Sequence, residues 1–227
     1  MGEADTLAAQ ISRRLRARPS ASVPELRRLR REISRDLRDA PARVVIRAAK
    51  EVSRMAHRGH RFVAYELVKH HPAAPSALDA KQLGRLGEGM DSWDAVDCFA
   101  IYLSGPAWQQ GRIPARVIHA WARSPDVWWR RAALVSTVPL NSRAHGGKGD
   151  TRQTLAVCRM LERDRDPMVV KALSWALREL SKRDPRAVGD FIAARAGSLA
   201  ALVKREVRNK LSTGLKNPGR RPKRARG

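Results

Sequence analysis

Residues 166–180 read Asp-Pro-Met-Val-Val-Lys-Ala-Leu-Ser-Trp-Ala-Leu-Arg-Glu-Leu, and two stripes of opposite character run along them at α-helical spacing. The apolar stripe, which predicts the face turned to a core, comprises Val169, Leu173, Leu177 and Leu180. The opposite stripe combines one indole with cations and comprises Lys171, Trp175, Arg178 and Lys182. A large aromatic side chain turned away from the core among cations suits a surface that meets a nucleic acid.

A second helix with a tryptophan at its margin is predicted from residues 92–103. Its core face comprises Val96, Phe99, Ala100 and Leu103. Trp93 and Asp97 lie one helical turn apart at the edge of that face. This helix therefore places a carboxylate close to an aromatic ring near a surface.

The composition indicates a folded polycation. The formal net charge is +24 and the isoelectric point is near 11.5, far beyond what solubility requires. Hydrophobic residues make up 43% of the 227 residues, which argues against wholesale disorder and allows one core or an elongated core divided among repeats. The partner of such a polycation is expected to be a polyanion, and nucleic acid, an anionic membrane and the ribosome all qualify.

The sequence disfavours both a membrane-spanning protein and a secreted one. No apolar run reaches the roughly 18 residues of a membrane span, and the N-terminus lacks the basic-then-apolar order of a signal peptide. Cys98 and Cys158 stand alone, without the CxxC spacing of a thiolate zinc site or the pattern of a disulfide framework. We expect a cytoplasmic, nucleoid-associated protein that does not bind membranes.

Nearly every periodic segment has the helical period, which predicts an all-α fold. We expect a single domain over residues 1–215 and a disordered basic tail over residues 216–227. Ser92, Asp166 and Asp184 are predicted to precede helix starts. The predicted helices span Thr6–Ala17, Val23–Leu37, Ala42–Ala56, Arg61–His70, Ala77–Leu86, Trp93–Leu103, Pro114–Arg123, Val127–Val138, Thr151–Arg163, Pro167–Lys182, Ala187–Arg195 and Leu199–Leu211.

An internal repeat connects three of these helices. Residues 126–134, 166–173 and 202–207 align with one another and place Arg131, Lys171 and Arg205 at equivalent positions. An offset of about 40 residues between paired helices is typical of HEAT and armadillo repeats, which stack into a curved solenoid. Cations aligned along its concave face would follow a phosphate backbone.

Asp97 is the strongest candidate for a catalytic residue. A carboxylate beside Trp93 in a very basic protein would repel phosphates, so a surface that binds DNA should keep it only for a purpose. The alternative is an exposed or arginine-paired aspartate on a helix.

Arg131 requires a partner, because its helical projection places it among apolar side chains where an unpaired guanidinium would be costly. That partner is either an internal carboxylate such as Asp97 or a phosphate. Trp93 and Trp175 could each cover a sugar or a base, and the alternative for both is helix packing.

Other chemistries lack a motif. The six histidines show no metal-ligand spacing, and the sequence contains no phosphate-binding, dinucleotide-binding or serine-hydrolase signature. We expect no metal and no cofactor.

The segments 91–97, 127–134 and 171–179 resemble, in order and approximate spacing, the AlkD family of HEAT-like DNA alkylation repair glycosylases. The resemblance extends from about Val44 to Leu211. It implies a solenoid whose concave cationic face grips duplex DNA and a monomeric enzyme without an obligate protein partner. It further implies hydrolysis of the N-glycosidic bond of cationic alkylpurines such as 3-methyladenine and 7-methylguanine, with little or no pocket for a flipped base.

Matched by motif, Asp97 looks like the family's catalytic carboxylate, and Trp93 and Trp175 look like its sugar-contacting tryptophans. Arg131 looks like its DNA-backbone arginine. The expected DNA-binding set comprises Arg130, Arg131, Lys171, Arg178, Lys182, Arg205 and Arg208. Two alternatives remain from the residues alone: a non-catalytic repeat module that binds DNA or RNA, and a protein-binding solenoid.

Overall fold

The structure, a computed structural model, describes residues 2–55 and 58–219, and over these residues it contains helices and no β-strand. The all-α, repeat-like fold predicted from the sequence is confirmed. In chain order the elements are α1 (Glu3–Arg16), α2 (Val23–Asp36), α3 (Ala42–Ser53), α4 (Arg58–His70), the 3-10 turn η1 (Pro75–Ala77), α5 (Ala80–Gly87), α6 (Trp93–Phe99), the π-helical turn η2 (Ala100–Ser104), α7 (Gly105–Gln109), α8 (Ala115–Ala122), α9 (Val127–Val135), α10 (Val138–Asn141), the 3-10 turn η3 (Arg143–His145), α11 (Thr151–Met160), α12 (Pro167–Leu180), α13 (Pro185–Ala194) and α14 (Ala201–Thr213).

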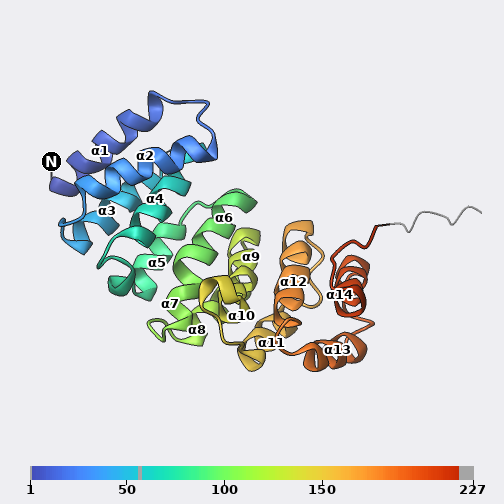
Figure 1. The fold of residues 1–227 in the computed structure, drawn as a ribbon. Coiled ribbons are helices and arrows are strands. Elements are labelled where there is room, and N and C mark those ends of the chain that lie inside the picture. Colours follow the sequence, from blue (N-terminus) through green and yellow to red (C-terminus); the bar gives the residue numbers. More distant parts are fainter. Residues whose placement is uncertain (1, 56–57, 220–227) are drawn as a thin grey trace, which may run out of the picture.

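The helices form two layers along a bent row that runs from α1 at one end to α14 at the other (Figure 1). In one layer α2 packs on α4, α4 on α6, α6 on α9, α9 on α12 and α12 on α14. We call this the site layer, because it carries the candidate residues described below. The other layer includes α1, α3, α5, α8 and α11, and each repeat pairs one helix from each layer, as α8 does with α9 and α11 with α12.

Side-chain caps explain several helix starts. Asp166 accepts a hydrogen bond from the backbone N–H of Met168 at 2.7 Å, and Asp184 accepts one from Ala187 at 2.9 Å, so both aspartates precede a helix as predicted. The second of these helices begins at Pro185, two residues before the predicted start at Ala187. Ser92 occupies the N-cap position of α6, so it precedes a helix start as predicted, but its side chain makes no capping hydrogen bond.

Prolines account for the two largest differences from the predicted helices. The helix predicted from Trp93 to Leu103 is α6 followed by the π-turn η2 and then α7, because Pro106 has no N–H to donate to the preceding turn. The helix predicted from Val127 to Val138 stops at Val135, and Pro139 lies in the separate helix α10. The remaining ends differ by a few residues, and the predicted end at Ala56 lies outside the described residues.

An aromatic cluster forms the part of the core that supports α6 and α9. The Trp129 ring lies 4.8 Å from that of Trp121 and 5.9 Å from that of Phe99, centroid to centroid. The end of α5 fits against it because Gly87 has no side chain: a Cβ there would lie 2.5 Å from the Trp129 ring. The core thus fixes α6 and α9 relative to each other.

Residues 216–219 of the predicted tail follow α14 without helical structure, and residues 220–227 lie outside the described residues. The boundary at residue 215 stays a prediction.

Candidate active site

The first turn of α6 carries Trp93 at the protein surface, and the second turn carries Asp97. The Trp93 side chain is 56% exposed, which is unusual for an indole in a folded protein. The Asp97 side chain is only 18% exposed. The helical spacing of four residues puts both on one side of α6.

Asp97 forms a bidentate ion pair with Arg131 of the neighbouring helix α9. Nε of Arg131 donates to Oδ1 at 2.9 Å, and Nη2 donates to Oδ2 at 2.8 Å. Arg131 is 5% exposed, so the pair is largely withdrawn from water. Of the two partners that the sequence left open for Arg131, the structure contains the internal carboxylate.

The guanidinium of Arg131 also reaches a third helix. Its Nη1 donates to the backbone carbonyl of Met168, in the first turn of α12, at 2.6 Å. One side chain thus bonds to α6 and α12 from its own position on α9. Since these bonds fix the guanidinium plane, they also fix the Asp97 carboxylate that it holds.

Burial and the ion pair shift the pKa of Asp97 in opposite directions. Burial raises the pKa of the Asp97 carboxyl above its ordinary value, while the hydrogen bonds and the charge of Arg131 oppose that rise, and Asp94 adds to it. Arg131 is therefore the group that favours the ionised carboxylate in a poorly solvated position.

Trp175 lies in the middle of α12, two helical turns beyond Met168, and is half-buried against the core. Lys171, one turn before it, is exposed, whereas Arg178 is half-buried and donates through Nε to the hydroxyl of Ser174 at 3.2 Å. Burial lowers the pKa of Arg178. Lys182 is exposed just beyond the helix end and pairs with Glu179 at 2.6 Å.

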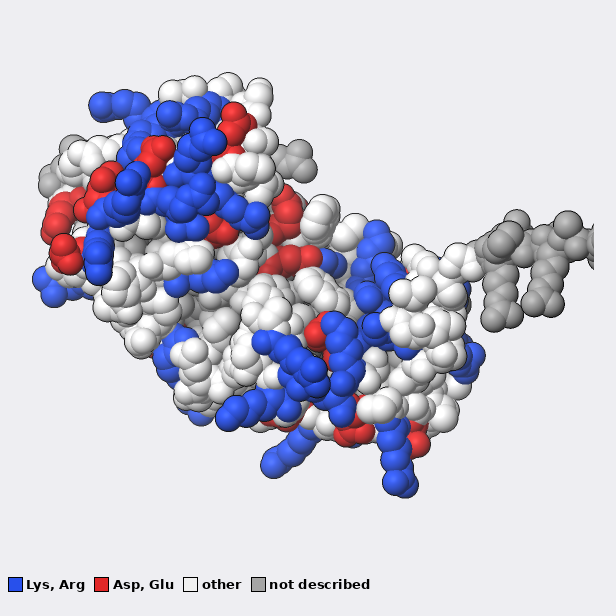
Figure 2. All heavy atoms as spheres, in the orientation of Figure 1, with Lys and Arg blue, Asp and Glu red and all other residues white. Residues whose placement is uncertain are grey.

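The other cations expected to bind DNA divide into two kinds. Arg130 is tied down: its Nε pairs with Asp164 at 2.8 Å and its Nη1 donates to the carbonyls of Ser124 and Pro125. Arg205 and Arg208, on α14, are both exposed. Figure 2 shows lysine and arginine side chains gathered over α2, over the region of α10 and α11, and near α12 and α14.

Sequence reasoning missed the groups that complete this arrangement. Met168 contributes a backbone carbonyl, which no side-chain pattern reveals, and Asp164 anchors Arg130 from the loop before α12. One signal was present: the pairs Asp97–Arg131 and Arg130–Asp164 are each separated by 34 residues, close to the repeat length.

Two further structural findings concern the described residues alone. Nowhere in residues 2–55 and 58–219 do three or more histidine, cysteine, aspartate or glutamate side chains converge as a metal site would require. In the same part of the chain, no helix combines the length and the apolar character needed to cross a bilayer.

Comparisons with known proteins cover most of the chain and identify its family. No curated protein matches it. The fold is similar to the solved structure titled "Predicted DNA alkylation repair enzyme from Enterococcus faecalis", with a TM-score of 0.69 and 17% sequence identity over 92% of this chain and 96% of that one. At this identity the similarity shows the fold. The family model described as DNA alkylation repair enzyme matches residues 20–211, which include every element from α2 to α13 and most of α14. The chain therefore belongs to the DNA alkylation repair enzyme family.

Proposed function

We propose that the protein is a monofunctional DNA glycosylase that hydrolyses the N-glycosidic bond of cationic N3- or N7-alkylated purines, such as 3-methyladenine and 7-methylguanine, in duplex DNA. The observation that carries the proposal is the buried pair of Asp97 and Arg131, which holds a carboxylate one turn from the exposed indole of Trp93. A surface that only binds DNA gains nothing from an anion fixed at such a desolvation cost.

The chemistry needs little help at the base. An alkylated purine already carries a positive charge, so when the bond between C1′ and the ring nitrogen breaks, the base takes both electrons and leaves neutral. The sugar becomes an oxocarbenium-like cation. Water then adds to C1′ and loses one proton, which leaves an abasic sugar in an intact strand.

Asp97 serves the sugar cation and the water. Each carboxylate oxygen uses one direction to accept from Arg131 and retains another in which it can face a substrate or water. The fixed negative charge stabilises the developing cation, and the carboxylate accepts the proton of the attacking water. Arg131 is then a positioning residue, since it keeps Asp97 ionised and oriented.

The tryptophans act through their ring faces. The exposed indole of Trp93 and the half-buried indole of Trp175 offer negative quadrupole density to the cationic sugar. We assign phosphate contacts to the exposed cations Lys171, Lys182, Arg205 and Arg208, with Arg178 beside them on α12. Arg130 bonds Asp164 and two carbonyls, so it ties the loop before α12 to the loop before α9 and is not assigned a phosphate.

The test is release of free base. Purified protein is incubated with duplex DNA methylated at purine nitrogens, and the supernatant is analysed for 7-methylguanine and 3-methyladenine. We expect both to be released, with strand scission appearing only after alkali treatment of the abasic product. Unmodified duplex should release no purine.

A second candidate, a non-catalytic repeat module that binds DNA or RNA, is favoured by the net charge of +24. It predicts tight binding to methylated duplex with no base released, which is the result that would contradict the glycosylase.

A further inference from the structure

A large groove opens beside Trp93, on the flank of α6 opposite to α9. It has a volume of about 1280 Å³ and is bordered by the α1–α2 loop and by α2, α4 and α6. Asp97 is not among its lining residues, whereas Trp93 is. The indole of Trp93 therefore belongs both to the candidate active site and to this groove.

The groove concentrates apolar and aromatic surface that is open to solvent. In the described part of the chain, the large hydrophobic side chains classed as exposed are Val23, Trp93 and Leu215, and the first two line the groove. The half-buried rings of Phe62 and Tyr102 also line the groove, but the guanidinium of Arg27 lies 5.7 Å from the first ring and the ammonium of Lys69 lies 4.0 Å from the second, so the free aromatic face is that of Trp93. Flat aromatic faces that stand free at a surface are what an unstacked nucleobase binds.

The border of the groove is mainly cationic. Among the described residues, the charged side chains that line it are the two acids Asp91 and Asp94, the glutamate-paired arginines Arg27 and Arg54, and Arg18 and Arg61. The side chains of Arg27 and Arg54 remain 47% and 43% exposed despite their ion pairs with Glu66 and Glu88. Arg61 is fixed by the carbonyls of Glu88 and Gly89 and by the hydroxyl of Tyr65.

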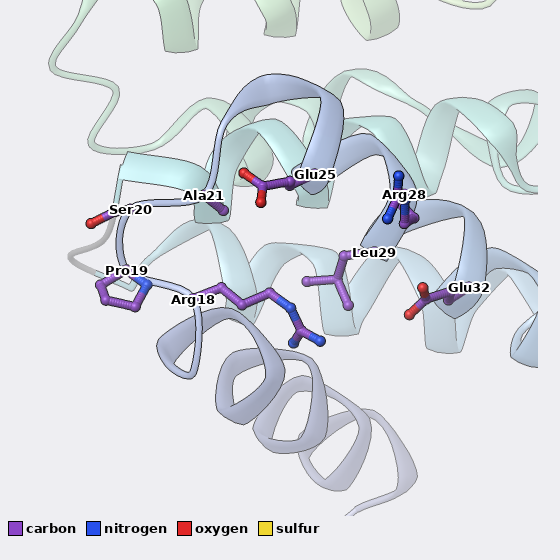
Figure 3. A pocket seen from close by; sticks show the side chains of 8 residues that line it. All are labelled: Arg18, Pro19, Ser20, Ala21, Glu25, Arg28, Leu29 and Glu32. Atoms are coloured by element: carbon purple, nitrogen blue, oxygen red, sulfur yellow. The ribbon is translucent and has the colours of Figure 1, made fainter.

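A smaller hollow near the α1–α2 loop lacks this combination. It measures about 520 Å³, and Figure 3 shows Glu25 and Glu32 in its lining, with Arg18 extended below Leu29. It has no aromatic side chain in its wall. Arg18 lines both hollows, whereas Arg27, Arg54 and Arg61 line the larger groove and not the smaller hollow.

We propose that the larger groove, which we call the nucleotide groove, binds an unpaired nucleotide of a DNA strand. The base stacks on the exposed indole of Trp93, and the phosphate lies near the exposed guanidinium of Arg54. Because bases within a duplex are stacked and paired, they cannot enter the groove. The signature is thus a preference for DNA that carries unpaired nucleotides, and the inference rests on the proposed function only in that its partner is DNA.

The experiment measures dissociation constants by fluorescence anisotropy at one salt concentration. Two lesion-free duplexes of equal length are compared, one fully paired and one with a two-nucleotide bulge. We expect the parent protein to bind the bulged duplex about tenfold more tightly, the size of effect that stacking of a single base supplies.

Val23→Glu locates the preference. Val23 is the first residue of α2, where a carboxylate is compatible with the helix N-terminus, and its side chain lines the groove. The added negative charge should repel the phosphate and abolish the tenfold preference while leaving the affinity for paired duplex within about twofold. Ala201→Glu, at the exposed first position of α14, is the matched control and should keep the preference.

Equal affinity of the parent for both duplexes would overturn the proposal, as would an unchanged preference in Val23→Glu. Circular dichroism checks that each variant is folded. Arg54→Gln, which removes a surface cation at the groove, is the second variant and should also reduce the preference. Neither duplex contains a lesion, so failure here leaves base release untouched, and failure of base release leaves this preference measurable.

Discussion

Arg131 is the residue on which the geometry of the site depends most. It bonds Asp97 on α6 and the carbonyl of Met168 on α12, and it lies almost entirely out of water. Removing one member of a buried ion pair leaves the other charge uncompensated, which costs about 3–5 kcal/mol of stability. Loss of Arg131 also changes the ionisation of Asp97, because Arg131 opposes the rise in the pKa of Asp97 that burial causes.

Arg131→Met should therefore shift the acid limb of the pH–rate profile to higher pH. The ionised carboxylate is the active form, so activity falls as the pH drops through the pKa of Asp97. That pKa is already raised by burial, and it rises further when the opposing cation is removed. The measurement is single-turnover base release against pH, with thermal unfolding in parallel.

Arg131→Lys keeps the charge but loses the bidentate geometry, so its acid limb should fall between those of the parent and Arg131→Met. Arg116→Met, at an exposed position of α8, should leave the profile unchanged. An acid limb that does not move in Arg131→Met would show that the ion pair does not tune Asp97.

Trp93 and Trp129 should separate activity from stability. Trp93 is mostly exposed, so Trp93→Ala should change the unfolding free energy by less than about 1 kcal/mol and yet strongly reduce base release. Trp129 packs in the aromatic cluster with Phe99 and Trp121, so Trp129→Ala should cost about 3–5 kcal/mol. Chemical denaturation of both variants checks this, and a large loss of stability in Trp93→Ala would contradict the exposed position.

At the level of the element, α5 contains two glycines with opposite surroundings. A Cβ at Gly87 would lie 2.5 Å from the Trp129 ring, whereas nothing lies within 4 Å of a Cβ at Gly84. Gly87→Ala should therefore destabilise the protein by about 1–3 kcal/mol, because the ring that supports α6 and α9 must move.

Gly84→Ala is the matched control in the same helix. It should stabilise the protein by about 0.5–1 kcal/mol, since alanine favours the helix and restricts the unfolded chain. Thermal denaturation of the two variants measures the difference, and equal midpoints would contradict the close contact between α5 and α9.

Helices could be predicted from the sequence better than their ends could. The apolar spacing identifies α12 and α6 and the faces that they bury, and the aspartates before Pro167 and Pro185 mark the starts of α12 and α13. The π-turn η2 and the break between α9 and α10 were missed, because periodicity continues through both while Pro106 and Pro139 remove backbone donors. Tertiary packing, here at Gly105 against Pro139, decides where such a helix is interrupted.

Over the whole molecule, the net charge of +24 predicts duplex binding that weakens steeply with salt. Lys171 and Arg205 occupy equivalent positions on α12 and α14 and are exposed. If each contacts a phosphate, replacing either with alanine should reduce the slope of log affinity against log salt concentration by about 0.9. Arg116→Ala, on the other layer, should leave the slope unchanged, and an unchanged slope in both site-layer variants would remove them from the DNA interface.

The candidate site was only partly predictable from the sequence. Helical spacing places Trp93 and Asp97 on one side of α6, and burial of Arg131 among apolar neighbours demands a partner. The choice between Asp97 and a phosphate depends on how α6 and α9 pack, which spacing within one helix does not determine. The hydrogen bond from Arg131 to the carbonyl of Met168 and the groove beside Trp93 depend on how several helices pack together. Neither feature leaves a pattern within one stretch of sequence.

The most direct test of the account is the single-turnover rate of 7-methylguanine release from methylated duplex by Asp97→Asn, at saturating protein. Asp190→Asn, at an exposed position of α13, is the control for the same change of charge. The account predicts that Asp97→Asn lowers the rate by at least about 100-fold while retaining affinity for DNA, and that Asp190→Asn matches the parent. A folded Asp97→Asn protein that releases the base at the parental rate would contradict it.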